Sequence, residues 1–75
     1  MTTFAKKYSS KSIAKKVLHK IFSVGSYSED GNHATARFVN GTVIKNNDGF
    51  NVELSSTYWS LSSLEKAFKV GIDKI

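Results

Sequence analysis

Three turn dipeptides constrain what this chain can fold into. Asp30-Gly31, Asn40-Gly41 and Asp48-Gly49 lie in the middle of the sequence, and the residues around them are rich in Val, Ile, Phe and Thr. Asn and Gly tolerate the positive φ angles of tight hairpin turns, and β-branched and aromatic residues favour strands. We therefore predict an antiparallel meander of three strands. A short fourth strand near residues 26–28 is expected to pair with residues 33–39 across the Asp30-Gly31 turn.

The alternation of side chains predicts which face of this sheet is apolar. A two-residue turn at Asn40-Gly41 places Phe38 opposite Val43. The next loop allows two registers, which place Val43 opposite either Leu54 or Val52. Both registers keep the same alternation, because side chains in a strand repeat every two residues. The expected apolar face carries Phe38, Val43, Phe50, Val52 and Leu54, and the opposite face carries Thr35, Arg37, Ile44, Asn51 and Glu53.

An amphipathic helix is predicted before the meander. Ser9 or Ser10 can accept a hydrogen bond from a free N–H of the first helical turn. Gly25 can end the helix. The residues ahead of this helix, 1–8, are expected to be a loosely held basic arm. The apolar residues that recur at helical spacing are Ile13, Val17, Leu18, Ile21 and Phe22.

A second helix is predicted after the meander. It is capped by Ser60 or by the Ser62-x-x-Glu65 capping box, and Gly71 weakens or ends it, so that 72–75 form a final turn or a tail. We expect both helices to pack on the apolar face of the sheet. The predicted fold is a two-layer α+β sandwich that forms a single small domain over residues 1–75.

The order helix, three strands, helix is similar to that of double-stranded RNA-binding domains. Those domains carry a lysine cluster at the start of the last helix. In this chain the corresponding stretch, SLSSLEKAF, holds one acid and one lysine, and the lysines lie in the first helix instead. The resemblance is one of topology, and no functional residue is carried over from it.

The charge is unevenly distributed along the chain. Residues 1–24 contain six lysines and no Asp or Glu, whereas residues 25–75 contain five basic and six acidic side chains. The two parts therefore carry +6 and −1, which together give the net charge of +5. Such an asymmetry points to a polyanionic or acidic partner for the first segment. The candidate binding residues are Lys6, Lys7, Lys11, Lys15, Lys16 and Lys20.

Two functions fit this charge. The leading hypothesis is a small non-enzymatic protein that contacts nucleic-acid phosphates, of DNA or RNA, without sequence specificity, since lysines bind phosphates as point charges and release counterions. The alternative is a phage-type inhibitor or adaptor that docks on an acidic surface of a larger host protein or enzyme, for example a nucleic-acid-processing or defence complex. A lysine-rich face that only interacts with water is the competing structural explanation.

Tyr58 and Trp59 are the candidate partner-binding aromatics. They lie within SSTYWSLSS, just before the second helix. Tyr and Trp supply large rigid contact areas at protein interfaces. Packing at the edge of the core is the competing role, and we expect at most one of the two side chains to be fully buried.

No catalytic, cofactor or metal site is predicted. The absence of Cys excludes a thiol nucleophile, a Cys-type zinc site and a disulfide. His33 lies near Glu29 and Asp30, but these three residues lack the spacing of a metal-ligand set. No glycine-rich phosphate loop and no nucleophile elbow occur. We therefore expect the chain not to be an enzyme and to need no cofactor.

No membrane partner is predicted, because no apolar run approaches the roughly 18 residues that span a bilayer. The apolar stripe of the first helix is needed by the core. We expect a cytoplasmic protein, in a bacterial host cell if the chain is of phage origin. An open edge strand would allow a homodimer.

Overall fold

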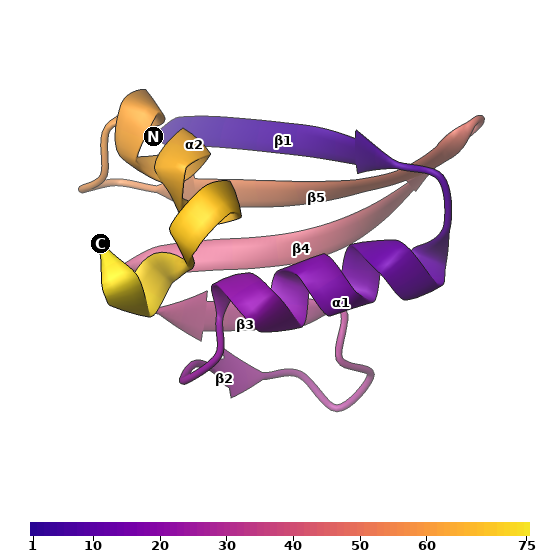
Figure 1. The fold of residues 1–75 in the computed structure, drawn as a ribbon, viewed down its shortest axis with the longest axis horizontal. Helices are drawn as coiled ribbons and strands as arrows, with labels where there is room; N and C mark the ends of the chain where they lie inside the picture. Colours follow the sequence, from indigo (N-terminus) through magenta and orange to yellow (C-terminus); the bar gives the residue numbers. More distant parts are fainter.

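The computed structural model describes residues 1–75 and contains one five-stranded antiparallel sheet with two helices (Figure 1). This confirms the predicted two-layer α+β architecture. The strands lie in the order β1-β5-β4-β3-β2. The elements are β1 (Thr2–Tyr8), α1 (Lys11–Ile21), β2 (Ser26–Tyr27), β3 (His33–Ala36), β4 (Val39–Asn46), β5 (Gly49–Ser56), α2 (Leu61–Val70) and the 3-10 turn η1 (Ile72–Lys74).

The loosely held arm predicted for residues 1–8 is wrong, because Thr2–Tyr8 forms the edge strand β1. It pairs with β5 along its whole length, from Thr2 opposite Ser56 to Tyr8 opposite Phe50. Alternate residues of β1 face the helices, and the Phe4 ring packs edge-on against Phe68 of α2 at 5.5 Å between centroids. The sheet therefore has five strands rather than three or four. A strand also precedes the first helix, unlike the helix-first order predicted from the sequence.

The predicted hairpin turn at Asn40-Gly41 is also wrong. The turn lies earlier, at Arg37 and Phe38, which adopt positive φ angles of 48° and 68°. Gly41 lies inside β4, opposite Ala34 and Leu54. A Cβ atom on Gly41 would lie 2.4 Å from the Phe22 ring, so this glycine allows the end of α1 to approach the sheet.

The shifted turn changes the faces of the sheet in one important respect. Phe38, predicted on the apolar face, is 75% exposed in the turn. Arg37, predicted on the opposite face, also lies in the turn rather than on a strand. Of the two registers that the sequence left open, the structure has the one with Val43 opposite Val52, across a loop in which Asn46 pairs with Gly49. The helix-free side of the sheet, called here the open face, carries Thr35, Ile44, Asn51 and Glu53 as predicted, together with Thr3, Lys7, Asn40, Thr42 and Ser55.

Both helices begin at predicted caps. The Ser10 hydroxyl accepts a hydrogen bond from the Ile13 N–H (3.2 Å), and Ser60, rather than Ser62, caps α2. Ile13, predicted in the apolar stripe, is 45% exposed, whereas Ala14 is fully buried because the helix turns this side to the sheet. The core consists of Ala14, Leu18, Ile21, Phe22, Ala34, Val39, Val52, Leu54, Leu64, Ala67 and Ile72.

Asp30 organises the turn between β2 and β3. Its carboxylate accepts hydrogen bonds from the Ser28 hydroxyl and from the Asn32 N–H, and these bonds hold the pKa of Asp30 below its ordinary value of 3.8. The pKa of Asp73 is lowered as well, chiefly by the hydrogen bond from Ser23. A carboxyl group whose folded pKa is lowered adds stability above its unfolded pKa, and this stability is lost as the pH falls through the folded pKa.

We therefore expect the melting temperature to fall as the pH is lowered below about 4. Asp30→Asn should reduce the size of this fall, because the asparagine does not titrate. Thermal unfolding followed by circular dichroism at several pH values measures both effects. Glu29→Gln, at an exposed position of the same turn, is the control. A wild-type melting temperature that stays constant into strong acid would contradict the prediction.

Candidate nucleic-acid interface

The positive charge of the chain lies in its helical layer. Helix α1 carries four lysines and no acid, and α2 carries two lysines and one acid, so the two helices together hold +5. The net charge of the whole chain is also +5, so the five basic and five acidic side chains outside the helices cancel. The helices cover one side of the sheet (Figure 1), and this side is therefore the basic one.

The lysines of α1 have no acidic partner. The ion pair of the structure joins Lys7 and Asp48, and none is formed by Lys11, Lys15, Lys16 or Lys20. Like charges four residues apart destabilise a helix by roughly 0.2–0.5 kcal/mol per pair, and α1 contains two such pairs. These cations are available to an external anion.

A shallow depression lies on α1, beside the β2–β3 turn. It has a volume of about 310 Å³ and is lined by Lys15, Lys16 and His19. The Lys15 ammonium group donates a hydrogen bond to the backbone carbonyl of Asp30 (3.0 Å), which holds it beside the β2–β3 turn. The His19 ring stacks on Tyr27 at 4.3 Å between centroids. The lining contains no carboxylate.

The structure separates Lys6 and Lys7. The Lys6 side chain lies on the helix side, where its ammonium group is 5.8 Å from the centre of the Phe68 ring. Lys7 lies on the open face and is paired with Asp48, whose pKa is lowered chiefly by this hydrogen bond. Lys7 therefore does not join the α1 lysines, because neighbouring residues of a strand point to opposite faces.

Tyr58 and Trp59 have different surroundings. Trp59 is half-buried against the core, and its indole N–H donates a hydrogen bond to the Arg37 carbonyl (2.9 Å). Tyr58 is 76% exposed, and its ring lies 5.0 Å from that of Phe38. Phe38 is a candidate site residue that the sequence prediction missed, because the Asn40-Gly41 turn placed it on the apolar face.

Ser56 holds this region together. Its buried hydroxyl donates a hydrogen bond to the Phe38 carbonyl (2.7 Å) and accepts hydrogen bonds from the backbone N–H groups of Tyr58 and Trp59 (both 3.1 Å). The β3–β4 turn and the segment after β5 are thus fixed to each other. The two exposed rings are displayed by a backbone that is already ordered.

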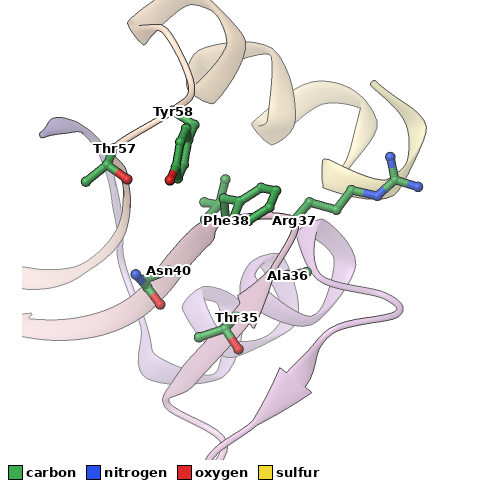
Figure 2. A pocket seen from close by; sticks show the side chains of 8 residues that line it. Thr35, Ala36, Arg37, Phe38, Asn40, Thr57 and Tyr58 are labelled. Carbon is green, nitrogen blue, oxygen red and sulfur yellow. The ribbon is translucent and has the colours of Figure 1, made fainter.

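A second depression lies beside these rings, and we call it the Phe38–Tyr58 depression (Figure 2). Its volume is about 350 Å³. It combines two aromatic rings with a carboxamide and hydroxyl groups, and no carboxylate lines it. Its lining residues are Thr35, Ala36, Arg37, Phe38, Val39, Asn40, Thr57 and Tyr58.

The remaining predicted features have these positions. His33, Glu29 and Asp30 do not form a metal-binding group, and no set of three or more His, Asp or Glu side chains is placed to hold a metal ion. None of the helices is long and apolar enough to cross a membrane.

The edges of the sheet are β1 and the two-residue β2, so β1 is the edge on which an edge-strand homodimer would form. β1 also carries Lys6 and Lys7, and lysines on an edge strand disfavour its pairing with a strand of another molecule.

Comparison of the chain with protein-family models, with curated proteins and with solved structures found no match.

Proposed function

We propose that this chain is a non-enzymatic nucleic-acid-binding protein that contacts phosphates through the helical layer, without sequence specificity. The observation that carries the proposal is the concentration of the whole net charge of +5 in α1 and α2. The lysines of α1 would make the central contacts, and Lys6 would extend them towards α2. Lys7 is left out of the proposed interface, since it faces the other side of the sheet.

The uncompensated lysines favour binding over solvation. A face that only interacts with water normally mixes charges of both signs. Here α1 has no acid at all, although one acid beside each lysine would stabilise the helix. Each lysine that binds a phosphate releases condensed counterions, which gives affinity for any sequence and a steep dependence on salt.

The test is a titration of the protein against a labelled duplex and a matching single strand at about 50 mM and about 200 mM salt. We expect binding that weakens steeply with salt for both. Lys15→Glu/Lys16→Glu should weaken binding to all sequences alike, by at least about tenfold, and reduce the salt slope by about two, one for each lost phosphate contact.

The matched control compares Lys7→Glu with Lys16→Glu, because the two variants make the same change in net charge but Lys7 lies on the open face. Lys7→Glu should retain most of the affinity if the helical layer is the interface. Equal losses in both variants would reduce the proposal to a net-charge effect. An absence of binding even at low salt would overturn it and favour the inhibitor or adaptor function, which recovery of one stoichiometric protein partner after nuclease treatment would support.

A further inference from the structure

We infer that the Phe38–Tyr58 depression binds an unpaired nucleobase, so that the protein prefers single-stranded to double-stranded nucleic acid. The inference rests on the proposed function and adds the class of nucleic acid that the site takes. Bases in a duplex are stacked on one another, whereas those of a single strand are free to stack on aromatic side chains, whatever their sequence.

The two rings are free to stack. Phe38 and Tyr58 are 75% and 76% exposed, and their planes are inclined by 57°, so neither ring covers the other. Two neighbouring aromatic side chains with this exposure are unusual on a small domain, where the core needs apolar residues. A planar ligand that stacks on either ring would remove this surface from water.

The other groups of the depression fit a nucleotide. The Asn40 carboxamide can both donate and accept hydrogen bonds to the edge of a base, and Thr35 and Thr57 supply hydroxyl groups. No carboxylate lines the depression, so an anionic ligand meets no repulsion there. An apolar peptide would leave these polar groups without partners, which makes a nucleotide the better occupant.

Arg37 connects the depression with the basic helix. Its side chain extends away from the depression towards the C-terminal segment (Figure 2). There the pKa of Asp73 is lowered chiefly by the hydrogen bond from Ser23, two residues beyond α1, and least by the charge of Arg37. Arg37 therefore offers a cation to the phosphate of a bound base, close to the Asp73 carboxylate and to the end of α1.

The backbone of the turn supports a binding role. Phe38 has a φ angle of 68°, in a region that Gly and Asn adopt with less strain. A glycine would suit this turn better, so the phenylalanine lowers the local stability. Strained residues of this kind cluster at binding sites, where the surrounding structure holds them in place. Here the Ser56 hydroxyl does so, through the Phe38 carbonyl.

The experiment compares a single strand of about 12 nucleotides with a strand of the same length and charge that has no bases. We expect the natural strand to bind about tenfold more tightly, since each stacked base contributes about that much. The natural strand should also quench the emission of Trp59, the one tryptophan of the chain, whose indole is hydrogen-bonded to the turn.

Phe38→Gly and Tyr58→Ser should abolish this difference and leave binding to the base-free strand unchanged. Phe38→Gly should also raise the melting temperature, so that a loss of affinity cannot be ascribed to unfolding. Val24→Ser, at a 70% exposed apolar position outside the depression, is the control. Lys15→Glu/Lys16→Glu should weaken binding to both strands alike.

The outcomes separate the two proposals. Equal affinity for both strands, unaffected by Phe38→Gly, would overturn the nucleobase site, leave phosphate binding intact and favour a protein partner for the exposed rings. Failure of both strands to bind would overturn the proposed function itself. Preference for the natural strand that persists in Phe38→Gly and Tyr58→Ser would place base recognition elsewhere on the molecule.

Discussion

Replacing Gly41 by alanine is expected to destabilise the fold by about 3 kcal/mol, near the upper end of the range for an overpacked core. The added Cβ would lie 2.4 Å from Cε2 of Phe22 and 2.7 Å from Cδ1 of Leu18. Both side chains are fully buried, so neither can move away without disturbing the core. For a domain of this size the melting temperature should fall by roughly 15 °C, which thermal unfolding followed by circular dichroism would measure.

A second variant identifies the cause. Phe22→Leu removes the ring that meets the new methyl group, so Gly41→Ala should cost less in the Phe22→Leu background than in the wild type, and a double-mutant cycle gives the difference. Asn40→Ala, at the neighbouring exposed position of β4, is the control and should be nearly neutral. Equal costs of Gly41→Ala in the two backgrounds would show that the glycine is needed for its backbone rather than for the approach of Phe22.

The same residue explains why the sequence misplaced the hairpin. Asn40-Gly41 is a strong local turn signal, and local preference was the only available guide to this turn. The glycine is instead required by α1, because the Phe22 ring and a methyl group of Leu18 lie directly over Gly41 in β4. Long-range packing therefore determined the use of the glycine, and the turn moved to Arg37 and Phe38, residues with no turn preference.

Strand β1 was missed for a related reason. All of its partners lie in β5, more than forty residues later in the sequence. Neither a turn dipeptide nor a continuous apolar run marks it, and its two lysines gave it the composition of an exposed arm. Phe4 and Tyr8 lie four residues apart, a spacing that fits one face of a helix as well as one face of a strand, so these two residues carry little weight without knowledge of the partner.

The helix caps and the basic face of the first helix were predicted correctly. Ser10 and Ser60 cap the two helices, since a cap depends on residues within one helical turn. The basic face of α1 was predicted from the same periodicity, because its lysines lie largely off the apolar stripe. Phe38 was missed as a candidate site residue, since its exposure depends on the register of β3 and β4, which the misplaced turn shifted.

Ser56 is the residue whose replacement should affect both the stability and the proposed nucleobase site. Its hydroxyl is the hydrogen-bond partner of three backbone groups, those of Phe38, Tyr58 and Trp59. Ser56→Ala would leave these groups without that partner in a position that is only 2% exposed. An unsatisfied buried polar group costs about 1–3 kcal/mol, and water can reach the Tyr58 side of the network, so we expect a loss of about 2 kcal/mol.

The matched control is Ser55→Ala, because Ser55 precedes Ser56 on the same strand but faces the open side of the sheet. It should change the free energy of unfolding little. Ser56→Thr, which keeps the hydroxyl, should be less destabilising than Ser56→Ala. Equal losses in the Ala and Thr variants would mean that the side-chain volume, and not the hydroxyl, is what the site requires.

The effect on binding should differ from the effect on stability. Without Ser56 the strained turn and the Tyr58 segment are no longer fixed to each other, so the rings of Phe38 and Tyr58 must be ordered when a base binds. The entropy of this ordering opposes binding to the natural strand alone, since the base-free strand does not use the rings. Ser56→Ala should therefore reduce the preference between the two strands at temperatures where the variant is still folded. A full preference in the folded variant would show that the rings bind without being held in advance.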